Sequence, residues 1–231
     1  MGRQGSMWLT VMSAALACGW VWTLSAQSSD KLVYADFEQV QDGRPVTSRG
    51  GAIQIFGYSE NTHRPPVFKG VAGLEPAAPE LVRVKPEDPN RLAKFDLELL
   101  TPNQWSGVVL ELKGLPDKDG EQVAEDVSGF KHFSIQVFAT GVPGIRVELL
   151  SRGQGRDEKI AHPQVTFIPK AGLNTYRVPL TKFSQPAWVT DTRVDPRDIM
   201  KQLTSINVTA YCDECRPSKG MVIVDNVMFE K

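Results

Sequence analysis

The chain has 231 residues, of which 23% are charged, and its formal net charge at pH 7 is −1. A charge so close to zero does not favour nucleic acid or an anionic membrane surface as a partner. The length suits one domain, and we expect a monomer.

An apolar segment lies at the start of the chain. It runs from Met7 to Ala26, follows an arginine, and closes on small residues. This is the layout of a secretory signal peptide. We therefore expect residues 1–28 to be a signal segment and residues 29–231 to form one exported domain, periplasmic or extracellular. Because the apolar run has about 20 residues, a retained membrane anchor is the alternative.

Strand patterns dominate the rest of the chain. In Arg91–Leu99 apolar and polar side chains alternate, as they do in a half-buried strand. Turn residues such as glycine, proline and aspartate separate the strand-like runs. About eleven short strands are expected, at Leu32–Glu38, Ala52–Tyr58, Leu81–Val84, Arg91–Leu99, Trp105–Leu112, Phe133–Ala139, Ile145–Leu149, Val165–Ile168, Tyr176–Val178, Ile206–Val208 and Met221–Phe229.

Only one helix is expected, at Pro196–Leu203, with Asp195 as its N-cap and proline at its first position. The longest connection, Ser59–Glu80, is rich in proline and glycine, and we expect an ordered surface loop there, with partial disorder as the alternative. Many short strands with one helical turn predict an all-β fold in which two antiparallel sheets form a sandwich.

Two cysteines follow the signal segment, Cys212 and Cys215. In an exported protein an isolated pair is usually a disulfide bond, and here it would shape a tight turn. A redox dithiol would be expected near the start of a helix in a βαβ unit, which the chain lacks at this point.

The final strand, Met221–Phe229, is apolar except for Asp225, and this predicts a central strand covered on both faces. Alternation puts Asp225 on the side of Ile223, Val227 and Phe229. If the first and last strands are neighbours, Asp36 and Glu38 converge on Asp225, and a hard cation that takes about six to eight oxygens would suit them. The alternative is that Asp225 accepts backbone hydrogen bonds and Asp36 faces water.

Polar and aromatic side chains collect on the strand faces opposite the predicted core. If the strands are neighbours, these residues form one platform that offers hydrogen bonds and ring faces to a sugar. The alternative is the ordinary polar face of an antiparallel sheet. The candidate ligand-binding residues are His132, Gln136, Arg146, Asn207, Tyr211 and the loop residue Trp188.

No catalytic motif is present. The sequence contains no G-x-S-x-G nucleophile turn and no glycine-rich phosphate loop between a strand and a helix. The strand carboxylates Asp96, Glu98, Glu111 and Glu148 fall on solvent faces by alternation, which argues against a hydrolase. We therefore expect no enzyme activity.

The order of several segments resembles a known family. These segments are Tyr34–Glu38, Trp105–Leu112, Asp126–Ile135, Tyr176–Leu180 with Pro186–Trp188, and Val224–Val227. Together they resemble the galactose-binding-like jelly roll of family 11 carbohydrate-binding modules and of the related complex I intermediate-associated protein 30 family.

The resemblance implies a jelly-roll β-sandwich without catalytic activity, often with a structural calcium ion that joins the terminal strands. Glu38 and Asp225 are the positions that would hold this ion, with Asp36 beside them. The resemblance favours an exported module that binds a glycan. The alternative from the same family is an envelope assembly or scaffolding protein that binds a protein partner.

Overall fold

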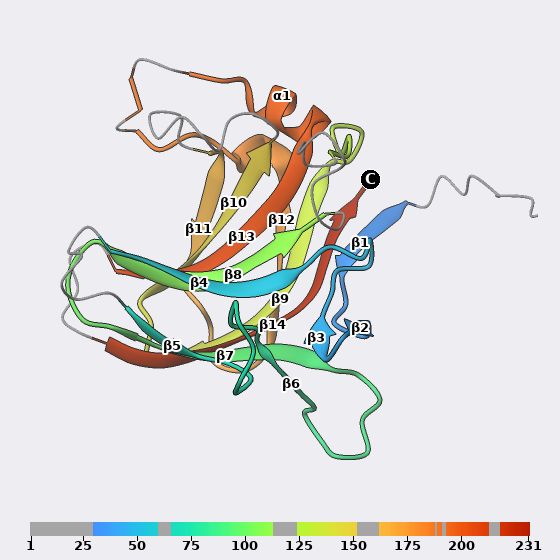
Figure 1. The fold of residues 1–231 in the computed structure, drawn as a ribbon. Coiled ribbons are helices and arrows are strands. Elements are labelled where there is room, and N and C mark those ends of the chain that lie inside the picture. Colours follow the sequence, from blue (N-terminus) through green and yellow to red (C-terminus); the bar gives the residue numbers. More distant parts are fainter. Residues whose placement is uncertain are drawn as a thin grey trace, which may run out of the picture.

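The structure is a computed structural model that describes residues 30–59, 66–112, 124–151, 162–187, 189–190, 193–212 and 218–231. Two antiparallel sheets lie face to face as a β-sandwich (Figure 1). The larger sheet contains β1 (Lys31–Ala35), β5 (Val67–Lys69), β6 (Glu80–Val82), β7 (Leu92–Leu99), β9 (His132–Thr140), β12 (Asn174–Pro179) and β14 (Ser218–Glu230). The smaller sheet contains β4 (Ile53–Ser59), β8 (Gln104–Glu111), β10 (Gly144–Ser151), β11 (Gln164–Phe167) and β13 (Leu203–Cys212).

The remaining elements are short. A two-stranded ribbon pairs β2 (Val40–Gln41) with β3 (Arg44–Pro45). A 3₁₀ turn, η1 (Leu180–Lys182), follows β12, and α1 (Pro196–Lys201) precedes β13. In the part of the chain that the structure describes, no helix has the length and apolar character needed to cross a membrane.

Strand order in the larger sheet is β12-β9-β14-β7-β5, with β1 paired to β14 and β6 paired to β7. The smaller sheet has the order β11-β10-β13-β8-β4. Every pairing in both sheets is antiparallel. This confirms the predicted all-β fold, a two-sheet antiparallel jelly-roll sandwich with one short helix.

The core forms where the apolar faces of the two sheets meet. The expected alternation in β7 is confirmed, since Phe95, Leu97 and Leu99 are buried while the polar residues between them are partly exposed. Phe229 of β14 lies at the centre of an aromatic group, with its ring centroid 5.6 Å from that of Phe133 and 6.1 Å from that of Tyr34. The core therefore joins the first strand to the last.

The two terminal strands are neighbours, as predicted. Leu32 pairs with Phe229 in the register of β1 and β14. β1 ends at Ala35 rather than at Glu38, because Phe37 takes a positive φ of 58° and the chain turns away there. The central position of β14 between β9 and β7 is also confirmed.

Two predictions about β14 are wrong. Only one face of the strand is fully buried, since Ile223 and Met228 on the other face are partly exposed. The register also shifts between Asp225 and Met228, where Asn226 has a φ of 47°. This bulge changes the alternation. Val227 and Phe229 therefore lie on the core-facing side of the strand, together with Val224, whereas Asp225 lies on the other side.

The helix begins as predicted and ends earlier. The side chain of Asp195 accepts a hydrogen bond from the backbone of Arg197, and the helix stops at Lys201 because β13 starts at Leu203. The long loop predicted from Ser59 contains the short strand β5, which pairs with β7. Residues 60–65 of that loop lie outside the described residues.

Candidate functional site

The outer face of the smaller sheet carries a row of aromatic rings. In register across three neighbouring strands, Tyr58 of β4 lies opposite Trp105 of β8, which lies opposite Tyr211 of β13. The rings of Tyr58 and Trp105 stack with their centroids 4.1 Å apart and an angle of 17° between their planes. Tyr58 is 45% exposed, so this row reaches solvent.

Arg146 of β10 lies beside this row. Its guanidinium carbon is 5.0 Å from the ring centroid of Trp105 and 5.4 Å from that of Tyr211. The side chain is only 13% exposed, and cation–π contacts with two rings stabilise the charge there. Arg146 is therefore held in one position on the sheet.

Gly107 and Gly144 make this packing possible. A Cβ atom at Gly144 would lie 2.8–3.0 Å from the ring of Tyr211, so the tyrosine ring occupies the space that a side chain would fill. Gly107 is the neighbour of Thr209 in the register, and a Cβ atom there would collide with the backbone oxygen of Val208 and lie 2.7 Å from Cα of Thr209, so only glycine fits against β13 at this point. A larger residue at Gly144 would displace the ring of Tyr211, and one at Gly107 would clash with β13.

A polar row runs parallel to the aromatic one. Gln164, Glu148, Asn207 and Gln54 lie on neighbouring strands at the same level of the sheet, with Val109 between the last two. Glu148 accepts a hydrogen bond of 3.4 Å from Asn207 and lies 3.4 Å from Nε of Arg146. We call Tyr58, Trp105, Arg146, Glu148, Asn207 and Tyr211 together the platform.

His162 lies close enough to the platform for the charge of Glu148 to act on its imidazole. Burial lowers the pKa of its imidazole, and the negative charge of Glu148 partly offsets this effect. Its Nδ1 atom is buried and makes no hydrogen bond within the described residues. The imidazole therefore favours its neutral form at the edge of the polar row.

The structure divides the predicted ligand-binding residues between two sheets. Arg146, Asn207 and Tyr211 come together on the platform. His132 and Gln136 are on β9 in the larger sheet, so the expectation of one shared face is wrong. β9 pairs with β14 and β12 rather than with β10 or β13, and alternation along a strand cannot reveal which strands are neighbours.

His132 and Gln136 have partners of their own on the larger sheet. Nη2 of Arg177 lies 2.8 Å from Nδ1 of His132, and Arg177 also bonds Glu230 at 2.6 Å. The amide oxygen of Gln136 accepts a hydrogen bond of 3.3 Å from Asn226 at the bulge. Both residues therefore support the larger sheet.

Tyr58 and Trp105 are the aromatic residues of the platform that the predicted ligand-binding residues did not include. Alternation along the strand already places Tyr58 on the face away from the core residues Ile53 and Ile55. Its contact with Trp105, however, depends on the pairing of β4 with β8. Trp188 and Cys215 lie outside the described residues, as do residues 1–28, for which a signal segment was predicted. The ligand role of Trp188 and the disulfide between Cys212 and Cys215 stay predictions.

Asp225 lies in a second cluster, beside the β14 bulge. Its carboxylate accepts hydrogen bonds from Nδ2 of Asn90 at 2.9 Å and from the backbone of Asn226 at 2.7 Å. Burial raises the pKa of Asp225, the hydrogen bonds oppose this, and the charges of Glu38 and Asp36 raise it further. The carboxylates of Glu38 and Asp36 are thus close enough to Asp225 to act on its charge.

The described contacts of this cluster are to N–H donors. Both carboxylate oxygens of Glu38 accept from Arg91, at 2.6 Å from its backbone and 3.2 Å from Nε, and Asp36 accepts from the backbone of Glu38. Within the described ranges, no three histidine, cysteine or carboxylate side chains are grouped so that they could hold a metal ion. A calcium ion would have to compete with these donors, and the site stays a prediction.

The raised pKa of Asp225 leads to a prediction about pH. The pKa of Asp225 in the folded chain is higher than its ordinary value of 3.8, so the folded chain binds this proton more tightly than the unfolded chain does. The folded state therefore loses stability as pH rises from 3.8 through the raised pKa. In EDTA, the unfolding free energy of the wild type should fall relative to that of Asp225→Asn over this range. Urea denaturation at several pH values measures both unfolding free energies. The prediction is contradicted if the wild-type value minus the Asp225→Asn value stays constant or increases as pH rises.

Comparison with solved structures places this geometry in a known fold. A family 11 carbohydrate-binding module of the cellulosomal cellulase Lic26A-Cel5E of Clostridium thermocellum is similar to the chain, with a TM-score of 0.55 and 13% identity over 87% of this chain and 94% of that one. The chain has the β-sandwich fold of family 11 carbohydrate-binding modules.

Two further structures support the same fold. A family 11 module from Clostridium thermocellum in complex with a β-1,3-1,4-mixed-linked tetrasaccharide has a TM-score of 0.55 and 14% identity, over 87% of this chain and 95% of that one. The solution structure of CtCBM11 has a TM-score of 0.50 and 16% identity, over 89% and 97% of the two chains. No protein-family model and no curated protein matches the sequence, and the resemblance to the complex I intermediate-associated protein 30 family stays a prediction.

Proposed function

We propose that the chain is an exported, non-catalytic module that binds a glycan on the platform. The observation that carries the proposal is the pair of parallel rows on the smaller sheet, one aromatic and one polar. A sugar ring presents C–H groups to an aromatic surface and hydroxyl groups to hydrogen-bonding side chains, and the two rows offer both. The fold shared with family 11 modules, one of them in complex with a tetrasaccharide, supports the proposal.

The charges of the platform favour a neutral glycan. Arg146 is the cation of the platform and lies beside the carboxylate of Glu148, so their charges largely cancel. An acidic polysaccharide would meet the negative charge of Glu148 and gain little from Arg146. We therefore expect neutral polysaccharides to bind more tightly than uronate-containing ones.

The direction of a bound chain follows from the sheet. The polar row extends from β11 to β4, and the aromatic row lies beside it on β13, β8 and β4, so a linear chain lying along them would contact each strand in turn. Tyr58, the most exposed ring of the row, would take the sugar at one end. Asn207 and Glu148 would bind hydroxyl groups nearer the middle.

The first test is binding to a panel of neutral and acidic soluble polysaccharides, measured by affinity electrophoresis and isothermal titration calorimetry. Tyr58→Ala and Tyr211→Ala should each weaken binding of the preferred glycan by about tenfold or more, because each removes one ring of the row. Phe138→Ala provides the matched control, since it removes an aromatic ring from the larger sheet.

The control should keep full affinity, and all three variants should melt cooperatively. Unchanged affinity in both tyrosine variants would remove the platform from the proposal. Binding to no polysaccharide, together with saturable binding to an envelope protein, would instead support the scaffolding alternative.

A further inference from the structure

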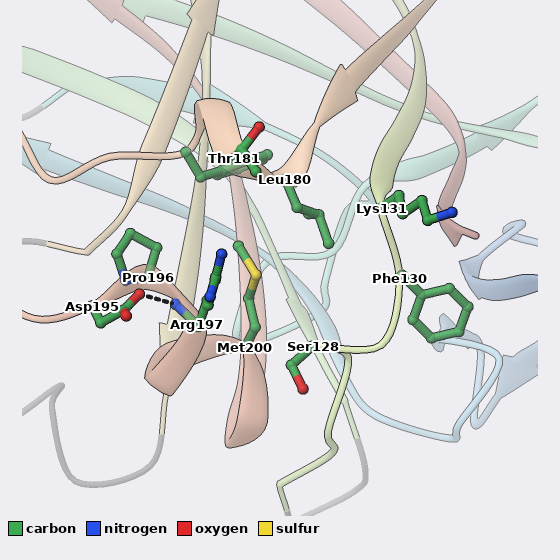
Figure 2. A pocket seen from close by; sticks show the side chains of 10 residues that line it. Ser128, Phe130, Lys131, Leu180, Thr181, Asp195, Pro196, Arg197 and Met200 are labelled. Carbon is green, nitrogen blue, oxygen red and sulfur yellow. Dashed lines mark hydrogen bonds between the residues drawn. The ribbon is translucent and has the colours of Figure 1, made fainter.

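A pocket outside the platform lies at the end of the sandwich where α1 begins (Figure 2). Its volume is about 430 Å³, within the range of small-molecule sites. Three segments form its walls: residues 128–131 before β9, η1 with Phe183, and residues 195–200. None of its lining residues belongs to the platform.

The floor of the pocket is apolar. Leu180, Phe183 and Met200 line it, and each is at most 5% exposed because it packs into the core. Side chains fixed in this way form a preformed surface that does not need to reorder when a ligand arrives. The floor suits the hydrocarbon part of a small molecule.

Arg197 supplies a cation at the rim. In Figure 2 its side chain rises beside Met200 toward η1, while the ammonium group of Lys131 on the opposite side points away from it. The guanidinium group of Arg197 makes no hydrogen bond or ion pair with any described residue. It is therefore available to a ligand.

The nearby carboxylates are already engaged. Asp195 accepts the backbone N–H of Arg197 at 2.9 Å as the helix cap, and Asp126 accepts two hydrogen bonds from Ser128. Asp198 pairs with Lys201 at 3.0 Å. No hydrogen bond or ion pair therefore joins one of these carboxylates to the guanidinium group of Arg197.

We propose that this pocket binds small monocarboxylates that carry an apolar chain. The guanidinium fork matches the two oxygens of a carboxylate, and the buried floor takes the hydrocarbon chain. A single guanidinium suits a singly charged group better than a phosphate, which needs more donors to balance its charge. Neither part alone would give useful affinity, so a bare anion and an uncharged chain should both bind poorly.

The test uses the full chain with ¹³C-labelled methionine methyl groups, and the Met200 signal is identified by its absence in Met200→Leu. Octanoate should shift the Met200 signal saturably, and acetate and 1-octanol should bind about tenfold more weakly or worse. Arg197→Gln should weaken octanoate binding about tenfold and leave 1-octanol binding unchanged. Lys182→Gln is the matched control, because Lys182 is an exposed cation on η1 that does not line the pocket.

The control variant should bind octanoate like the wild type. The proposal is overturned if octanoate does not shift the Met200 signal or if 1-octanol binds as tightly as octanoate. It is also overturned if Arg197→Gln weakens octanoate binding no more than Lys182→Gln does. Glycan binding should be unchanged by octanoate, which separates this site from the platform.

Discussion

Phe229→Ala should lower the unfolding free energy by about 3–5 kcal/mol, since it removes the ring at the centre of the core and leaves a cavity. Phe229 is fully buried, and its ring contacts those of Tyr34, Phe130 and Phe133. The substitution also weakens the packing that holds β1 against β14. Urea denaturation of the full chain, followed by tryptophan fluorescence, measures the loss.

Met228→Ala is the matched control for this experiment. Met228 is the next residue along the same strand, but it lies on the outer side and is only partly buried. Its loss should be no more than about 1 kcal/mol. If Phe229→Ala does not unfold as a single species, Phe229→Leu should show a smaller loss of about 1.5 kcal/mol or less. Equal losses in Met228→Ala and Phe229→Ala would contradict the central place of the Phe229 ring.

Calcium should raise the melting temperature of the metal-free chain. Burial is the main cause of the raised pKa of Asp225, and the negative charges of Glu38 and Asp36 add to it, so a cation bound beside Asp225 would offset both effects. At about a hundred times its Kd, a bound ion adds about 2.7 kcal/mol by mass action. For a domain of this size that is a rise of about 5–10 °C.

The calcium experiment needs a variant that separates the cluster from general ion effects. Asp225→Asn should abolish the rise, whereas Asp96→Asn, at an exposed carboxylate on β7, should keep it. Equal melting curves in millimolar calcium and in excess EDTA would remove the site. In that case the hydrogen bonds from Asn90, Asn226 and Arg91 are the whole explanation of the cluster.

The platform shows how far the sequence could predict the site. Tyr211, Asn207 and Arg146 were identified because alternation places them opposite the core residues of their own strands. His132 passed the same test on its strand and nevertheless lies on the other sheet. A residue's side of its strand is a local property, but its neighbours across the sheet depend on pairings between segments far apart in sequence.

The β14 bulge shows a different limit. Asp225 and Val227 are two residues apart, which on a regular strand puts them on one face. At Asn226, which has a positive φ, the register with β9 shifts and β14 forms a bulge. The side chains of Asp225 and Val227 then lie on different sides of the strand. Nothing in the alternating pattern of Met221–Phe229 signals this, because the bulge is stabilised by contacts with Gln136 and Asn90 on distant segments.

The sequence by itself determined the all-β class, the positions of most strands, their core-facing residues and the helix cap at Asp195. These features follow from side-chain periodicity and local hydrogen bonding, which act over a few residues. The tertiary structure alone decided which strands lie side by side, and so which side chains form the platform, the Asp225 cluster and the Arg197 pocket. Each of these sites joins segments that are separated by many residues, and only the packing of the two sheets brings them together.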